Sequence, residues 1–209
     1  MKKKLVGIID YNCGNLRSIK NAFDKIKVKN YIIKDNVSFD KATHIVLPGV
    51  GAFDKAMRTL KELNLISSIK KFNKDKKPIL GICLGMQLLF EFSQENNTTQ
   101  GLELIKGNVV KIKNKFPYKI PVIGWNKVKL DIKINNTLFK GIKDNSYFYF
   151  IHSFMVETNR LNKKSLITYN FMKNKIIAAV IKENIFGCQF HPEKSGKAGI
   201  KILENFVKI

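Results

Sequence analysis

The most informative stretch of the sequence is Gly81-Ile82-Cys83-Leu84-Gly85. Residues 79–82 form a short apolar run typical of a buried strand, and residues 84–92 place their apolar side chains on one side of a helix. A nucleophile between two glycines at this point is the cysteine form of the G-x-S-x-G elbow, a tight turn that lifts the sulfur above the strand end. The N-terminus of the following helix favours a thiolate. The pentapeptide alone also fits a buried cysteine in an ordinary strand-to-helix turn.

Alternating strands and helices precede this stretch. We expect strands at residues 5–9, 31–33 and 44–47, and helices at 52–63 and onward to 72. Asn15 is expected to cap a first helix with an apolar face. Because strands and helices alternate, the order predicts an α/β fold, with a mostly parallel central sheet covered by helices on both faces.

The second half of the chain is richer in strands. Candidates are residues 128–134, 148–154, 176–181 and 185–190, and residues 182–184 are short enough to join the last two as a hairpin. A final helix is expected from about residue 197, with Ile200, Leu203 and Val207 facing inward. Since the chain shows no linker, repeat or low-complexity segment, a single domain over residues 1–209 is the economical interpretation.

Composition indicates a globular protein and excludes several classes. Hydrophobic residues make up 44% and aromatic residues 11%. The chain lacks an apolar run of the roughly 18 to 20 residues that span a membrane, and its basic start leads into an apolar segment too short for a secretory signal. We therefore expect a cytoplasmic protein without a membrane partner. Its 3 cysteines suit neither a disulfide framework nor a zinc site, and no metal or cofactor is expected.

The net charge of +22 raises nucleic-acid binding as a possibility. Of the 38 basic residues only Arg17, Arg58 and Arg160 are arginines, and the lysines are scattered along the chain. Arginine is the better fork for phosphates and bases. A lysine-rich solvated surface without a nucleic-acid partner is therefore expected, although the charge can still attract anionic substrates or acidic partners.

A cysteine nucleophile needs a base, and three histidines are present. His191 belongs to Phe190-His191-Pro192-Glu193, directly after an apolar run, and Glu193 can orient its ring as the acid of a triad does. His44, at the start of an expected strand, is interpreted as structural. His152 lies within an apolar strand and is interpreted as a satisfied core or pocket-wall histidine.

Acyl transfer also needs donors for an oxyanion. Pro48-Gly49-Val50-Gly51 follows the expected strand 44–47 and therefore lies at the same sheet edge as Cys83. Glycines allow its amides to turn toward a substrate. The expected donors are an amide near Val50 and the amide of Leu84. The loop alone is a weak motif, because many strand-to-helix turns contain glycines.

Together these motifs, in this order and rough spacing, closely resemble the class I glutamine amidotransferases over almost the whole chain. The resemblance implies that Cys83 attacks the side-chain amide of glutamine, that His191 passes a proton to the departing ammonia, and that Glu193 supports His191. It also implies a glutamine-binding and oxyanion set made of Gly49, Val50, Gly51, Leu84, Gln87, His152, Ser153 and Phe154.

A finer resemblance is to the family of glutaminase subunits of imidazole glycerol phosphate synthase. It rests on Asp10-Tyr11-Asn12, Gly14-Asn15, Gly124-Trp125-Asn126, Tyr149-Phe150-Ile151-His152-Ser153 and Lys194. This implies a heterodimer in which ammonia passes to a separate cyclase subunit with a (β/α)8 barrel, for histidine and purine synthesis. The partner interface would include Asn12, Asn15, Trp125, Tyr149 and Lys194. The chain has neither a Walker A loop nor an added synthetase domain, so the ammonia acceptor is expected to be another chain.

Three alternatives stay open at this point. The same glutaminase chemistry can feed another acceptor, such as a sugar-modifying amidotransferase or a different biosynthetic synthase. A free-standing cysteine hydrolase of γ-glutamyl compounds would need no partner. A non-enzymatic binding module on this fold is the third, and the intact set of Cys83, His191 and Glu193 argues against it.

Overall fold

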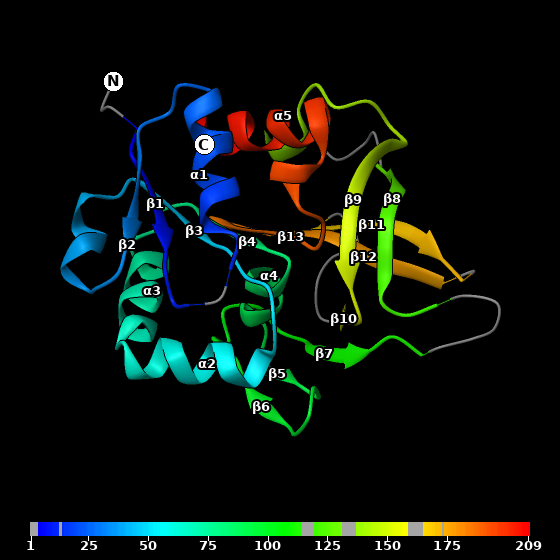
Figure 1. Cartoon of the computed structure of the whole chain (residues 1–209), viewed down its shortest axis with the longest axis horizontal. Helices are drawn as coiled ribbons and strands as arrows, with labels where there is room; N and C mark the ends of the chain where they lie inside the picture. The colour runs from blue at the N-terminus through cyan, green and yellow to red at the C-terminus, as the bar shows by residue number, and fades with distance from the viewer. Residues whose placement is uncertain (1–3, 13, 114–118, 131–136, 159–164, 173) are drawn as a thin grey trace.

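A nine-stranded mixed sheet forms the centre of the protein (Figure 1). The computed structural model describes residues 4–12, 14–113, 119–130, 137–158, 165–172 and 174–209. In the sheet the strands follow the order β2-β1-β3-β4-β13-β12-β11-β8-β9. Their bounds are β1 (Val6–Ile9), β2 (Asn30–Ile33), β3 (His44–Leu47), β4 (Ile79–Ile82), β8 (Val122–Lys129), β9 (Ser146–His152), β11 (Leu166–Phe171), β12 (Asn174–Lys182) and β13 (Ile185–Cys188).

The sheet changes character at β13. From β2 to β13 every neighbouring pair is parallel, whereas from β13 to β9 every pair is antiparallel. The expected α/β class and strand-rich second half are both confirmed. The parallel part matters for function, because the carboxyl ends of its strands share one edge, which is where ligands bind in open α/β sheets.

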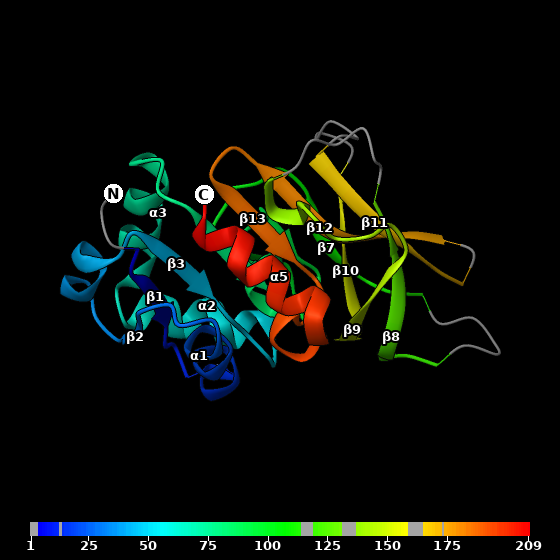
Figure 2. The same cartoon turned by 90° about the horizontal axis from the view of Figure 1, so that it is seen from above.

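Helices cover both faces of the sheet (Figures 1 and 2). Helices α1 (Leu16–Lys25) and α5 (Gly196–Val207) pack on one face, and α2 (Phe53–Glu62), α3 (Leu65–Lys74) and the short α4 (Leu84–Leu88) on the other. Three 3-10 helices, Val37–Lys41, Thr137–Phe139 and Pro192–Lys194, lie in the connections of the described residues.

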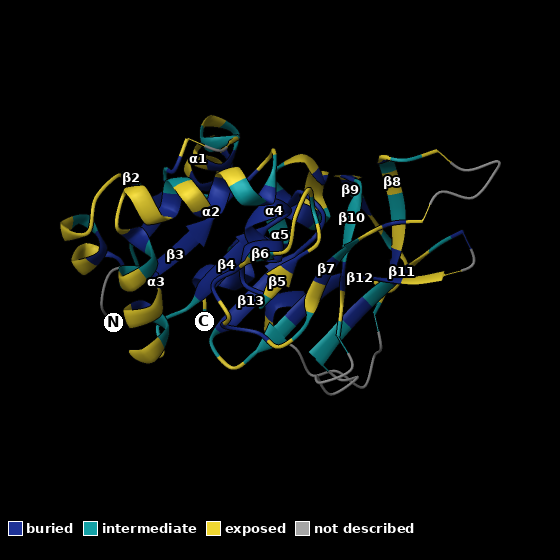
Figure 3. Cartoon of the chain, turned by 90° about the horizontal axis from the view of Figure 1, so that it is seen from below, coloured by how far each residue is buried: buried dark blue, intermediate teal, exposed yellow. Residues whose placement is uncertain are grey.

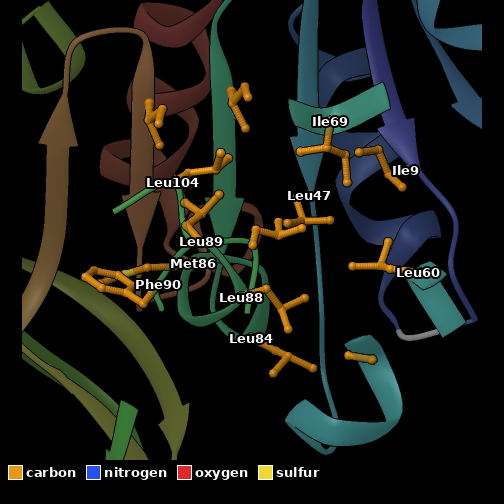
Figure 4. Close-up of a cluster of buried hydrophobic side chains, with 14 of the residues drawn as sticks. Ile9, Leu47, Leu60, Ile69, Leu84, Met86, Leu88, Leu89, Phe90 and Leu104 are labelled. Atoms are coloured by element: carbon orange, nitrogen blue, oxygen red, sulfur yellow. The ribbon is translucent and has the colours of Figure 1, made fainter. Parts of the chain in front are cut away.

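The core follows from the alternation of strand side chains. Neighbours along a strand point to opposite faces, so Ile9 and Leu47 enter the cluster under α2 and α3, whereas Ile8 and Val46 enter the cluster under α1 and α5. Figure 4 shows the first cluster, in which Leu60 and Ile69 of the helices meet side chains of the strands and of α4. The innermost strands are buried along their length, and the outer surfaces of α2 and α3 are exposed (Figure 3).

A second, four-stranded sheet in the order β10-β7-β5-β6 was not expected from the sequence. It contains β5 (Phe92–Ser93), β6 (Thr99–Gln100), β7 (Asn108–Lys111) and β10 (Phe154–Glu157). The expected helix 84–92 is correspondingly too long. The carbonyl oxygens of Leu88 and Leu89 accept the amides of Leu102 and Leu104, at 2.8 and 2.9 Å. Because residues 102–104 bond these carbonyl oxygens, the helix ends at Leu88. Phe92 lies in strand β5, with 40% of its surface exposed.

Other boundaries differ in the second half. The expected strand 128–134 is shifted, since β8 ends at Lys129 and residues 131–134 lie outside the described residues. The expected strand 148–154 is split at Ser153 between β9 and β10. The predicted hairpin is confirmed, because Lys182 pairs with Ile185 across an antiparallel turn. In the described part of the chain, every helix is too short or too polar to cross a membrane.

Candidate active site

Cys83 occupies a strained turn between β4 and α4. Its φ of 53° and ψ of −110° are unusual for a residue with a side chain, as expected for a nucleophile elbow. The two flanking glycines are sterically required. A Cβ on Gly85 would overlap the carbonyl oxygen of Leu47, and a Cβ on Gly81 would lie 2.6 Å from the carbonyl oxygen of Gly85. The close packing of α4 on the ends of β3 and β4 therefore holds Cys83 at the carboxyl edge of the sheet.

His191 and Glu193 reach the same edge because β13 pairs with β4. The pairing aligns Cys188 with Ile82, and His191 follows shortly after β13. The Nδ1 atom of His191 lies 2.8 Å from Oε1 of Glu193, and the two side chains are 2% and 0% exposed. The structure thus brings the predicted base and acid together.

The surroundings of His191 favour the charged form of its ring. Burial alone disfavours the charged ring, but the interactions with Cys83 and with the Glu193 carboxylate prevail and raise the pKa of His191 to about 10. Because Nδ1 is engaged by Glu193, Nε2 is the nitrogen left for proton transfer. This buried atom has no hydrogen-bond partner among the described residues.

The glycine loop 48–51 packs against the elbow. A Cβ on Gly49 would lie 2.9 Å from Cβ of Leu84, so the loop and the start of α4 are in direct contact. The Tyr11 hydroxyl donates a hydrogen bond to the Pro48 carbonyl and also lies close to Gly49. Leu84 begins α4, and amides in the first turn of a helix have no partner within that helix. Val50 and Leu84 both line the cavity beside Cys83, as the predicted pair of oxyanion donors requires.

A cavity of about 260 Å³ opens beside the Cys83 sulfur. Its lining contains most of the predicted glutamine-binding residues; Gly49 is outside the lining and lies close to Leu84. A larger hollow of about 900 Å³ lies between the two sheets and is lined by none of the predicted site residues. The cavity at Cys83 is lined by Val50, Gly51, Cys83, Leu84, Gln87, Glu95, Pro121, Ile151, His152, Ser153 and Phe154.

The other histidines have the structural settings that the sequence suggested. In His152, Nδ1 lies 2.7 Å from the Phe154 carbonyl and Nε2 lies 2.7 Å from the Tyr169 hydroxyl. Burial lowers the pKa of His152 to about 4, so the ring is neutral and both nitrogens are occupied. His44 stands at the amino end of β3, packs on Phe206 of α5, and has its pKa lowered to about 4, mainly by burial.

Three of the predicted interface residues, Trp125, Tyr149 and Lys194, lie side by side. The Trp125 and Tyr149 rings meet edge-on with their centroids 6.0 Å apart. Nζ of Lys194 lies over the Tyr149 ring, 6.0 Å from its centroid. Asn12 is exposed, and its backbone N–H donates to the Asp10 carboxylate. Asn15 is placed differently from the expected cap. It occupies the N-cap position of α1, but its side chain makes no capping bond and donates instead to Oε1 of Glu193 at 2.8 Å.

Sequence reasoning missed two polar residues at the site. Glu95 lines the cavity and accepts a hydrogen bond from the Phe53 amide at 2.9 Å. Gln189 is 0% exposed, and its Nε2 lies 3.6 Å from the Cys83 sulfur. One signal for Gln189 was available, since it is the only polar side chain within residues 185–190 apart from the thiol of Cys188. A polar residue in a buried strand context needs a partner.

Comparisons with known proteins agree with this geometry. The family described as "Glutamine amidotransferase class-I" matches residues 7–209. "Imidazole glycerol phosphate synthase subunit HisH 1" of Campylobacter jejuni is 44% identical over 206 residues, which cover 98% of this chain and 100% of that protein. "Imidazole glycerol phosphate synthase subunit HisH" of Methanocaldococcus jannaschii is 46% identical over 208 residues, which cover 98% and 100%.

Solved structures share the fold at lower sequence identity. The structure of PurLQS from Thermotoga maritima superposes with a TM-score of 0.75 at 20% identity, covering 99% of this chain and 98% of that one. A structure described as a glutamine amidotransferase has a TM-score of 0.73 at 15% identity, covering 98% and 99%. The family match over nearly the whole chain, together with the elbow at Cys83 and the His191–Glu193 pair, shows that the chain belongs to the class I glutamine amidotransferases.

Proposed function

We propose that this protein is the glutaminase subunit of an imidazole glycerol phosphate synthase. It hydrolyses glutamine to glutamate and ammonia and delivers the ammonia to a separate cyclase subunit. The observation that carries the glutaminase chemistry is the convergence of the strained Cys83 elbow and the buried His191–Glu193 pair at one edge of the sheet, where β4 and β13 end side by side. Relatives about 45% identical that bear the subunit's name support the choice of synthase.

The proposed reaction proceeds through a thioester on Cys83, with His191 as the proton carrier. His191 takes the proton of the Cys83 thiol, and the sulfur attacks the side-chain carbonyl carbon of glutamine. Amides of Val50 and Leu84 stabilise the oxyanion. His191 then gives its proton to the amide nitrogen, the C–N bond breaks and ammonia leaves a thioester on Cys83. Water attacks the thioester while His191 accepts its proton, and glutamate leaves as the thiol is restored. Glu193 stabilises the charged imidazolium in both steps.

The cavity suits glutamine in size and polarity. Its volume of about 260 Å³ is small, as a single amino acid requires, and the reactive sulfur lies in its wall. The Glu95 carboxylate provides an acceptor for the α-ammonium group. Burial raises the pKa of this carboxyl group, a cost that a bound ammonium would offset. Gln87 and the backbone of His152, Ser153 and Phe154 supply further polar contacts.

The surface next to this cavity supports a protein partner. On the outer side of β8 and β9, Ile123 pairs with Ile151 and Trp125 pairs with Tyr149. Ile123 and Trp125 are 61% and 52% exposed, and Ile151 also lines the cavity. We infer that a cyclase subunit with a (β/α)8 barrel covers this surface, contacts Asn12, Asn15, Trp125, Tyr149 and Lys194, and receives the ammonia to form imidazole glycerol phosphate and aminoimidazole carboxamide ribotide in cytoplasmic histidine synthesis.

The test of the chemistry is covalent labelling in the complex with the cyclase. A glutamine-derived affinity label is expected to modify Cys83 alone, as read by peptide mass spectrometry, and Cys83→Ala is expected to abolish glutamate release while the circular dichroism spectrum is unchanged. Cys188→Ala is the matched control. Cys188 is fully buried with a raised pKa, so its thiol is inert and its loss should leave labelling intact. Full glutaminase activity in Cys83→Ala would refute the mechanism.

A further inference from the structure

Gln189 is a fully buried polar residue at the active site that the mechanism above does not use. It follows the last residue of β13, and its side chain contacts both Gln87 of α4 and Cys83 of the elbow. Its Oε1 accepts a hydrogen bond from Nε2 of Gln87 at 3.0 Å, and its own Nε2 lies 3.6 Å from the sulfur of Cys83. A chain of two amides therefore connects the cavity wall to the nucleophile.

The direction of this chain is fixed by a backbone carbonyl. Nε2 of Gln87 also lies 3.3 Å from the carbonyl oxygen of Phe154. A carbonyl oxygen can only accept, so Gln87 must turn its NH2 group toward both Phe154 and Gln189. Gln189 must then present its oxygen to Gln87. The only orientation that satisfies these contacts points the NH2 group of Gln189 at the Cys83 sulfur.

The His191 ring interacts with the Cys83 side chain, and two further neighbours of the sulfur favour opposite protonation states. The Ile151 carbonyl oxygen lies 3.7 Å from the Cys83 sulfur and can only accept, so it favours the protonated thiol. The Gln189 NH2 group can only donate, so it favours the thiolate. A hydrogen bond to the charged form of a buried group stabilises that form. Gln189 therefore opposes the Ile151 carbonyl in setting how readily the thiolate forms.

We propose that Gln189 is a positioning residue that stabilises the Cys83 thiolate, held in its donating orientation by Gln87 and the Phe154 carbonyl. This rests on the proposed function only in giving the thiolate a catalytic purpose. The hydrogen-bond network itself is independent of any substrate.

The test is the pH dependence of Cys83 alkylation in the full-length chain. Iodoacetamide reacts with the thiolate, and mass spectrometry of the Cys83 peptide separates its rate from those of the other cysteines. Gln189→Met retains the length of the side chain and removes the donor. The midpoint of the rate–pH curve is expected to rise by about one pH unit, which lowers the alkylation rate below the midpoint about tenfold.

Two further variants keep the result interpretable. Asn205→Leu is the matched control, because Asn205 is another buried amide that donates two hydrogen bonds, to Leu138 and Lys140 of a remote loop. It should cost stability without moving the alkylation midpoint. Gln189→Asn retains the amide but withdraws it by one methylene, and it is expected to raise the midpoint as Gln189→Met does. If Gln189→Met does not fold, the alkylation midpoint of Gln189→Asn tests the proposal instead.

An unchanged midpoint in the folded Gln189 variants, or an equal shift in Asn205→Leu, would overturn the proposal. Because iodoacetamide requires neither glutamine nor a partner, this outcome is separate from a failure of the proposed function. A chain that does not hydrolyse glutamine can still show the shift, and a working glutaminase can still lack it.

Discussion

At the scale of single residues, Asn15 connects the proposed partner surface to the proposed catalytic triad. Its amide donates at 2.8 Å to Oε1 of Glu193, the same oxygen that lies 2.8 Å from His191. The other carboxylate oxygen, Oε2, is buried and has no partner among the described residues. Glu193 therefore depends on two contacts to one oxygen for its orientation.

Removing the Asn15 contact is expected to slow the chemistry. Asn15→Ala deprives a buried carboxylate of a hydrogen bond, which is worth about 1.5–3 kcal/mol. We therefore expect kcat for glutamate release to fall about tenfold or more. KM for glutamine should change little, because Asn15 does not line the cavity. The measurement is steady-state kinetics at saturating cyclase.

The control for this experiment is Asn12→Ala, in the same loop. Asn12 is exposed and bonded locally to Asp10, so its loss can weaken cyclase affinity without touching Glu193. If saturating cyclase restores kcat in Asn15→Ala as it does in Asn12→Ala, Asn15 acts through the interface, and its role in orienting Glu193 is disproved.

Residues differ in how far the sequence could predict them. Cys83, His191 and Glu193 lie in short motifs that indicate a nucleophile, a base and an acid. The structure brings these three residues together. Gln189 and Glu95 have no such local pattern. Gln189 meets Cys83 only because β13 pairs with β4, and Glu95 enters the cavity only because its carboxylate bonds the first residue of α2. Their roles depend on tertiary contacts far apart in sequence.

At the scale of elements, the connection between β1 and α1 contacts two parts of the site. Tyr11 bonds the Pro48 carbonyl, and a Cβ on Gly14 would lie 3.8 Å from the Val50 nitrogen. Asn15, at the end of the same connection, bonds Glu193. A partner that binds this connection would therefore contact a segment that touches both the glycine loop and Glu193 of the proposed triad.

The sequence predicted the central elements better than the peripheral ones. β3 and β4 are short buried strands with clear boundaries, and both fall where expected. The small sheet of β5, β6, β7 and β10 escaped prediction because its strands are as short as two residues and only half-buried. Strands of this kind are stabilised by pairing with distant segments, which local periodicity does not report.

We expect the glycine loop to gate activity. Its glycines permit more than one backbone orientation, and only one aims an amide at the oxyanion. Loss of one such donor costs about 10²- to 10³-fold in rate. The isolated chain is thus expected to be nearly inactive, and docking of the cyclase with its bound ribonucleotide to favour the competent orientation by differential binding.

The measurement is glutamate release by the chain alone, with the cyclase, and with the cyclase plus its nucleotide substrate. The rate should rise across these three conditions. A free chain that already turns over glutamine at the rate of the full complex would show that the loop does not gate the reaction. It would instead favour the free-standing hydrolase that the sequence left open.

At the scale of the whole molecule, the net charge of +22 is the most unusual property. Several lysines that the structure describes are on exposed helix surfaces, and some pair with acidic neighbours, as Lys20 does with Asp24 at 2.7 Å. Exposed pairs of this kind contribute little to stability. The remaining charge acts over long range and can speed encounters with acidic surfaces or anionic substrates.

A charge of this kind predicts a specific pattern of binding to DNA. Scattered lysines neutralise phosphates without reading bases, so affinity should be weak, independent of sequence, and steeply reduced by salt. Fluorescence anisotropy with two unrelated duplexes of equal length, titrated at about 50 and about 200 mM salt, measures all three properties. Equal affinity for both duplexes at low salt, with a loss of roughly a thousandfold or more if several phosphates are contacted, is the expected result. Tight binding to one duplex at the higher salt would mean that the surface carries a base-reading site, and the charge would then need a functional explanation of its own.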